Sequence, residues 1–193
     1  MGKMRRFLRK SEVGSEPLAV TMSAVRLGER ALQVGLDDPA IAAAIAAKTG
    51  MTGEASLVVA DDQAAAAARD AIAKAGGLGD VRVIAGLHPL PFADSSFDLV
   101  VVHTARGLLA SLSADVRERV LTECRRVLRA GGRLVALDVG SPEGLRGLFG
   151  GARPDSAYES AGGTAAALES AGFRPVRTLG DRQGYRFIEG LKG

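Results

Sequence analysis

A chain of 193 residues, 47% hydrophobic and 24% charged, has the size and balance of one globular domain with a substantial core. Its only cysteine is Cys124, and its two histidines are far apart, which excludes an intramolecular disulfide and gives no sign of a metal site. We expect a cytoplasmic protein, because no apolar run reaches the roughly 18 residues of a membrane span and the N-terminus lacks the apolar stretch of a secretory signal.

The net charge of +3 is unevenly distributed. Residues 1–10 carry five basic and no acidic side chains, and the rest of the chain has 20 basic against 22 acidic residues, a net charge of −2. A basic domain surface for nucleic acid is therefore not expected. We expect residues 1–15 to form a basic arm ahead of a domain over residues 16–193. The arm is either a solvated extension or, through residues 1–10, a contact for an anionic membrane or a protein partner.

The first half of the chain alternates apolar runs with segments typical of helices. Asp38 is a favourable N-cap, Pro39 suits the first helical position, and Gly50 is a natural stop. Five consecutive alanines favour another helix that packs closely on a sheet. The predicted elements are a helix over 16–27, a strand over 31–35, a helix over 39–50, a strand over 55–60 and a helix over 63–75.

The second half continues the alternation. A stripe of apolar residues with helical spacing runs through Cys124, which places this thiol in the core as a structural residue. Ser113 is the expected N-cap of that helix, and Gly131-Gly132 is its expected end. The predicted elements are strands over 81–85, 97–103 and 132–140, a Gly-rich stretch over 141–163, a helix ending at 171, and a hairpin over 174–180 and 184–192.

Strands that alternate with helices predict an α/β fold with helices on both faces of the sheet. The apolar runs lack clean alternation, as is typical of parallel strands covered on both faces. We therefore expect a Rossmann-like, doubly wound, mostly parallel sheet of seven strands, with the C-terminal hairpin as an antiparallel edge.

Two segments narrow this fold class to a family. The stretches SSFDLVVVHTARGLLASL (95–112) and ECRRVLRAGGRLVALDVG (123–140), with LPFADSSFD (90–98), resemble class I S-adenosylmethionine-dependent methyltransferases, especially the ubiquinone/menaquinone biosynthesis type. The resemblance extends over roughly residues 17–192. It implies a methyltransferase fold with S-adenosylmethionine as cofactor, held by loops at the carboxyl ends of the first strands.

The loop after the first strand departs from the family pattern, D/E-x-G-x-G-x-G. Gln33 stands in the place of the acid, and of the glycines only Gly35 is present, since Asp37 and Pro39 replace the other two. Glycines let the backbone approach the cofactor closely, so these side chains bring Cβ atoms where the backbone should be bare. The resemblance still implies cofactor contacts at Gly35, Leu36 and Asp37.

Two interpretations of the acids in this loop stay open. Asp37 and Asp38 either attract the sulfonium or ammonium of the cofactor while opposing its carboxylate, or Asp38 and Pro39 simply start a helix. The same choice arises after the second strand. The resemblance implies that Asp61, with Asp62 beside it, accepts hydrogen bonds from the ribose hydroxyls, but an aspartate there can equally be a helix cap.

After the third strand the family carries an acid that meets the adenine amino group. Here that position falls on Gly86 or Leu87, neither of which is an acid, and we expect Leu87 to pack on the purine ring instead. His88 and His103 are expected in loops at the end of the sheet, where His103 is a candidate cofactor contact. A histidine in such a loop is more often a bystander than a base.

Two functions follow from these residues. The first is a methyltransferase that acts on a small or lipid-like acceptor, bound between the N-terminal helix and residues 141–163, with catalysis mainly from positioning and no identified catalytic residue. The alternative is a catalytically degenerate domain that serves as a binding or regulatory subunit, docked through the basic arm or an oligomer face. A nicotinamide dehydrogenase is less favoured, because its pyrophosphate needs the same glycines.

Overall fold

The computed structural model describes residues 17–140 and 156–193. The predicted basic arm, residues 1–15, and residues 141–155 of the Gly-rich stretch lie outside this part of the chain. The helices are α1 (Leu18–Ser23), α2 (Pro39–Thr49), α3 (Asp62–Lys74), α4 (Leu108–Ser111), α5 (Ala114–Val127), α6 (Ser156–Ser160) and α7 (Gly163–Ser170), with a 3-10 turn, η1 (Ala85–Leu87). The strands are β1 (Arg30–Val34), β2 (Glu54–Val59), β3 (Asp80–Val83), β4 (Phe97–Thr104), β5 (Leu128–Val139), β6 (Val176–Arg182) and β7 (Tyr185–Leu191).

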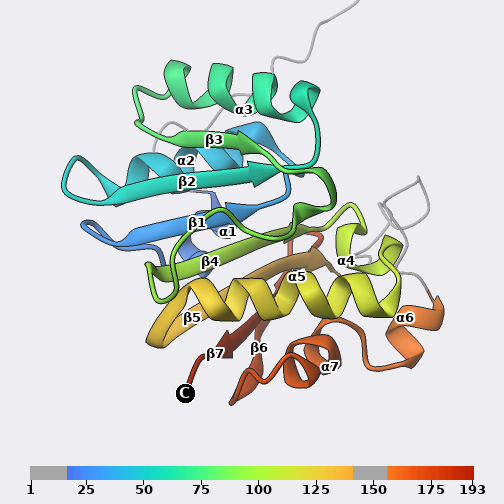
Figure 1. Ribbon diagram of the computed structural model, residues 1–193. Helices are drawn as coiled ribbons and strands as arrows, with labels where there is room; N and C mark the ends of the chain where they lie inside the picture. The colour runs from blue at the N-terminus through green and yellow to red at the C-terminus, as the bar shows by residue number, and fades with distance from the viewer. Residues whose placement is uncertain (1–16, 141–155) are drawn as a thin grey trace, which may run out of the picture.

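These strands form one seven-stranded sheet in the order β3-β2-β1-β4-β5-β7-β6 (Figure 1). β1 to β5 pair in parallel, and β7 pairs antiparallel with both β5 and β6. The predicted fold class, the doubly wound sheet and the C-terminal hairpin are therefore confirmed. The chain runs outward from β1 toward β3 in its first half, and from β4 toward the opposite edge in its second half.

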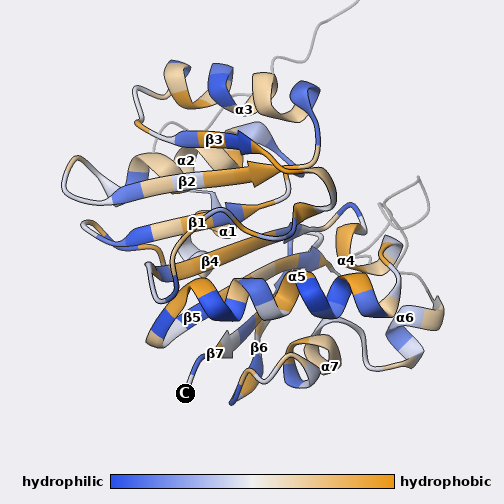
Figure 2. Cartoon of the chain, in the orientation of Figure 1, coloured by the Kyte–Doolittle hydropathy of each residue, from blue (hydrophilic) through white to orange (hydrophobic). Residues whose placement is uncertain are grey.

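Helices cover both faces of the sheet because the strands carry apolar side chains on both faces. On one face the strands pack against α1, α2 and α3, with Ile45, Ala65 and Ala68 in the contact. On the other face they pack against α4, α5 and α7, with Val120, Cys124 and Leu168 buried. In Figure 2 the central strand β4 is mostly orange, whereas α5 is largely blue with orange residues between. The predicted core position of Cys124 is confirmed, and burial raises the pKa of its thiol to about 12, so the thiolate is suppressed.

Two predicted element boundaries are wrong. The helix predicted over 16–27 ends at Ser23, because Ala24 adopts a left-handed conformation (φ +52°). The long helix was expected to reach Gly131, but it ends at Val127 and β5 begins at Leu128. Leu128 pairs with Phe97 of β4, and the register then shifts, so tertiary pairing outweighs the local helical pattern. Gly131, the expected end of the helix, adopts a left-handed conformation (φ +70°), but inside the strand.

Within the described residues, no helix is long and apolar enough to span a membrane.

Candidate functional site at the carboxyl edge of the sheet

The centre of the sheet is the point at which the direction of the chain reverses. β1 and β4 are neighbours, and the chain leaves them in opposite directions across the sheet. In doubly wound sheets such a reversal opens a crevice outside the carboxyl ends of the strands, where ligands bind. The turns that follow β1, β2 and β3 end at this edge. They contain all of the residues predicted from the sequence to hold a cofactor except His103, which lies in β4 itself.

Gly35 forms the bare and tightly packed start of the turn after β1. Its φ of +79° is in the left-handed region, and its N–H donates to the Val58 carbonyl at 2.9 Å. A Cβ atom added at Gly35 would lie 2.7 Å from Leu108 Cδ2 and 3.0 Å from the His103 carbonyl oxygen. Leu36, the next predicted contact, is half-buried against the cluster under α2 and α3.

Asp37 connects the turn after β1 to the turn after β4. Its side chain is 7% exposed, and its carboxylate accepts hydrogen bonds from the Ala105 N–H at 2.7 Å and the Arg106 N–H at 3.2 Å. Burial raises the pKa of Asp37, while these two amides and the Arg106 charge act in the opposite direction. The Asp37 carboxylate thus links the turns that follow the two central strands, β1 and β4.

Asp38 and Pro39 have the structural role that the sequence left open for them. The Asp38 side chain accepts from the Ala40 N–H at 2.8 Å, and Pro39 occupies the first turn of α2. The helix-start interpretation of these two residues is therefore confirmed. The chain turns sharply into α2 directly after the buried Asp37.

Gln33 and His103 form a neutral pair below this turn. The Gln33 amide donates to the Ala42 carbonyl at 3.0 Å, and its Oε1 lies 2.9 Å from His103 Nε2. An amide oxygen only accepts, so His103 Nε2 carries the hydrogen in this contact. Burial lowers the pKa of His103 to about 4, which keeps the ring neutral at physiological pH.

The predicted loop position of His103 is wrong. It lies within β4, is 1% exposed, and faces α2 through Gln33 rather than the crevice. The physical reason is that β4 extends to Thr104, so the imidazole points into the layer between sheet and helix. His103 instead shapes the site from below, since its carbonyl oxygen is one of the atoms that leave Gly35 no room for a side chain.

Asp61 and Asp62 lie at the carboxyl end of β2, and both are exposed. Asp61 is the N-cap of α3, with Oδ1 accepting from the Ala64 N–H at 2.8 Å, and Asp62 is in the first turn. The cap interpretation of Asp61 is confirmed. Its other oxygen makes no hydrogen bond to the residues that the structure describes, so the cap leaves one acceptor available at this edge.

Gly86 and Leu87, in the 3-10 turn η1 that follows β3, have an unusual backbone conformation, with φ of +72° and +59°. Gly86 is exposed, and a Cβ atom there would meet nothing within 4 Å. Leu87 is 2% exposed and belongs to the core on the α5 face. The expectation that Leu87 packs on a purine ring is therefore wrong, because the two consecutive left-handed residues turn its side chain inward.

Sequence reasoning missed Asp138, at the carboxyl end of β5. It pairs in register with Thr104 of β4 and with Arg186 of β7, and it is 4% exposed. Its Oδ1 accepts from the Val139 N–H at 2.8 Å, while Oδ2 has no hydrogen-bond partner within the described residues. Burial raises the pKa of Asp138, and the nearby Thr164 hydroxyl and Arg186 act against this rise. The sequence signal was one charged residue inside the apolar run LVALDV.

Replacement of Asp138 by asparagine is expected to stabilise the protein by about 1–3 kcal/mol at pH 7, because it removes an incompletely paired buried charge. A raised folded-state pKa means that the protonated form contributes stability below the unfolded pKa, and that this contribution is lost as pH rises through the folded pKa. The advantage of Asp138→Asn should therefore shrink as pH falls toward 3.8. Urea unfolding at several pH values measures it.

Asp98→Asn is the matched control. Burial raises the pKa of Asp98, but the hydrogen bonds from Arg129 Nε at 2.5 Å and the Arg30 N–H at 2.8 Å, with the charges of Arg129 and Arg133, together hold it below the usual value. This variant should lose stability at pH 7, the opposite sign. Equal effects of the two substitutions would contradict the account of Asp138.

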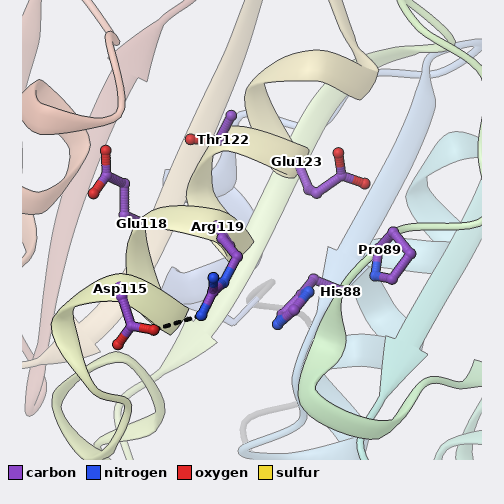
Figure 3. Close-up of a pocket in the computed structure, with 7 residues that line it drawn as sticks. All are labelled: His88, Pro89, Asp115, Glu118, Arg119, Thr122 and Glu123. Carbon is purple, nitrogen blue, oxygen red and sulfur yellow. Dashed lines mark hydrogen bonds and ion pairs between the residues drawn. The ribbon is translucent and has the colours of Figure 1, made fainter.

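A surface pocket of about 470 Å³ lies elsewhere, between the turn after η1 and the outer face of α5 (Figure 3). Figure 3 shows His88 and Pro89 on one side and a row of α5 side chains, including Arg119 paired with Asp115, on the other. Glu123 in this row is already engaged by the Leu90 N–H and by Arg126. None of the predicted cofactor residues lines this pocket.

Curated proteins similar to this chain include quinone-biosynthesis methyltransferases. The chain is 32% identical over 124 residues to the ubiquinone/menaquinone biosynthesis C-methyltransferase UbiE of Ectopseudomonas mendocina, covering 64% of this chain and 46% of the relative. It is 31% identical over 125 residues to the protein of the same name from Teredinibacter turnerae, covering 64% of this chain and 48% of the relative. The chain therefore aligns with about half the length of these relatives.

Solved structures share the fold. A SAM-dependent methyltransferase from Aquifex aeolicus superposes with a TM-score of 0.66 at 21% identity, covering 91% of this chain and 88% of that chain. PigF with SAH gives 0.59 at 21% identity, covering 86% and 51%. The [4+2]-cyclase SpnF gives 0.65 at 18% identity, covering 91% and 79%.

The family follows from the sequence match. The model of the methyltransferase domain matches residues 32–136, which is more than half of the chain and extends from within β1 to within β5. The curated relatives and the solved structures agree with this match. The chain therefore belongs to the methyltransferase domain family, among the class I S-adenosylmethionine-dependent methyltransferases.

Proposed function

We propose that this protein transfers the methyl group of S-adenosylmethionine, the cofactor of its family, to a small or lipid-like acceptor at the carboxyl edge of the sheet. The observation that carries the proposal is that Gly35, Asp61 and Gly86 follow the carboxyl ends of three neighbouring parallel strands, β1, β2 and β3. Bare backbone, an exposed carboxylate and open space are suited to a nucleoside with ribose hydroxyls.

The residues present fit the nucleoside end of this cofactor. Asp61 has an oxygen beyond the one that caps α3, which suits the acceptance of hydrogen bonds from ribose hydroxyls. Gly86 is exposed, with free space where a Cβ would stand. In the turn after β1, the Asp37 carboxylate already accepts hydrogen bonds from two backbone amides.

Bound S-adenosylmethionine supplies a methyl group on a sulfonium, an electrophile that a nucleophilic acceptor attacks in line. The part of the protein in such a transfer is positioning, for which oriented binding of the two reactants contributes most of the rate. The acceptor class is argued from the names of the relatives, which describe C-methylation in quinone biosynthesis. Residues 141–155, expected to line the acceptor pocket, lie outside the described part of the chain.

Binding of S-adenosylmethionine and S-adenosylhomocysteine, measured by calorimetry and thermal shift, tests the proposal. We expect micromolar affinity, and at a ligand concentration 100 times the Kd a stabilisation of about 2.7 kcal/mol. Methyl transfer is then measured as S-adenosylhomocysteine released with quinol-like acceptors. No stabilisation at millimolar ligand would contradict the proposal and support the alternative of a binding or regulatory domain.

Substitutions at Asp61 separate its two roles. Asp61→Ala removes both the helix cap and the carboxylate, whereas Asp61→Ser keeps a good N-cap and removes only the carboxylate. We expect both variants to lose at least tenfold in affinity for S-adenosylhomocysteine, and only Asp61→Ala to lose about 1 kcal/mol of stability without ligand. Asp70→Ala, farther along α3 and exposed, is the control that should keep wild-type affinity. An unaltered affinity of Asp61→Ser would remove Asp61 from the site.

A further inference from the structure

The turn after β4 directs two backbone donors toward the turn after β1. Gly107, with φ of +85°, closes this turn by donating its N–H to the Thr104 carbonyl at 2.9 Å. The N–H groups of Ala105 and Arg106, the two central residues of the turn, are thereby left without partners in the turn. Both donate to the same carboxylate, that of Asp37. Successive amides aimed at one anion form a binding site for carboxylates or phosphates.

The anion that fills this site comes from the opposite side of the crevice. Asp37 stands two residues beyond Gly35, at a position where the family pattern has a glycine. Its carboxylate is nearly excluded from solvent, which disfavours the ionised form. The charge of Asp138 disfavours the ionised form further, whereas the charge of Arg106 favours it. Two amides therefore hold the Asp37 carboxylate, but its desolvation weakens this contact. Another carboxylate is able to replace that of Asp37 there.

We infer that the Ala105 and Arg106 amides are a subsite for an amino-acid carboxylate, and that Asp37 competes with the ligand for this subsite. The inference rests on the proposed function, because S-adenosylmethionine and S-adenosylhomocysteine both carry such a carboxylate. Of the two effects that the sequence suggested for Asp37, it keeps the opposition to the cofactor's carboxylate and drops the attraction of its sulfonium or ammonium. Asp37 then lowers the affinity for ligands with an amino-acid moiety and leaves the affinity for the nucleoside alone unchanged.

The test compares two ligands on matched variants. S-adenosylhomocysteine carries the carboxylate, and 5′-methylthioadenosine has the same thioether nucleoside without the amino-acid moiety. Asp37→Asn keeps the size of the side chain but removes its charge, and it replaces one acceptor by a donor that the Arg106 N–H cannot bind. Asp38→Asn is the control, since it removes the same charge one residue later, retains an N-cap and has no contact with these amides.

By calorimetry we expect Asp37→Asn to bind S-adenosylhomocysteine at least tenfold more tightly than the wild type, and 5′-methylthioadenosine within twofold. Asp38→Asn should change the two affinities by the same small factor. Asp37→Ala, which also clears the space, is the second variant and should give the same preference if Asp37→Asn folds poorly. Melting without ligand checks the fold of each variant.

An unchanged or weaker affinity of Asp37→Asn for S-adenosylhomocysteine, with 5′-methylthioadenosine binding retained, would overturn the competition and leave the proposed function intact. Weaker binding specific to S-adenosylhomocysteine would instead support attraction of its ammonium by Asp37. Failure of both ligands to bind the wild type and every variant would overturn the proposed function and the subsite together. The two failures are therefore distinguishable.

Discussion

Gly35→Ala is expected to lower the free energy of unfolding by about 3 kcal/mol and to abolish binding of S-adenosylhomocysteine. A non-glycine residue at a φ of +79° costs about 1–2 kcal/mol by itself. The new Cβ would also lie 3.0 Å from the His103 carbonyl oxygen, which is backbone of a central strand and cannot move aside, and 2.7 Å from Leu108 Cδ2. Urea denaturation measures the loss as a lower midpoint at an unchanged m value.

Gly184→Ala is the matched control for Gly35→Ala. Gly184 has nearly the same φ, +81°, in the turn between β6 and β7, but a Cβ atom there meets nothing within 4 Å. It should therefore lose only the backbone cost of about 1–2 kcal/mol and keep wild-type ligand affinity. Equal losses in the two variants would show that the crowding beneath the turn after β1 contributes nothing.

Arg133→Met is expected to cost about 3 kcal/mol, the second large effect. Arg133 of β5 and Glu29, which precedes β1, form a bidentate pair with both N–O distances at 2.9 Å, and their side chains are only 14% and 13% exposed. Arg133 also donates to the Ala24 carbonyl after α1. Removal of one partner leaves the Glu29 carboxylate in a poorly hydrated place, which costs more than the pair itself contributes.

A double-mutant cycle separates the energy of the Arg133–Glu29 pair from the cost of leaving the Glu29 charge without Arg133. Arg133→Met combined with Glu29→Leu should recover most of the loss, because no unpaired charge remains. Lys74→Met removes one member of an exposed pair with Asp70, whose side chains are 74% and 65% exposed, and should stay within about 0.5 kcal/mol of the wild type. Additive losses in the double variant would show that Arg133 acts through its packing and its contact with Ala24 instead.

The order of the elements was predictable from the sequence because each signal is local. Apolar runs without alternation mark strands that are covered on both faces, and a residue such as Asp38, followed by Pro39, satisfies its own backbone within one turn. The same holds for the left-handed Gly131, which was predicted, although the strand around it was not. Whether Leu128 ends a helix or begins a strand depends on Phe97, about thirty residues earlier in the chain.

The direction of each side chain at the site was decided by the tertiary structure. The sequence alone determined the fold class, the family and the set of loops that meet at the crevice, because strand order and loop composition follow from local patterns. It gave no means to foresee that Asp37 reaches the amides of Ala105 and Arg106, that His103 pairs with Gln33, or that Leu87 turns into the core. These contacts join residues up to 70 positions apart, and only the packing of β1 against β4 brings such partners within hydrogen-bond distance.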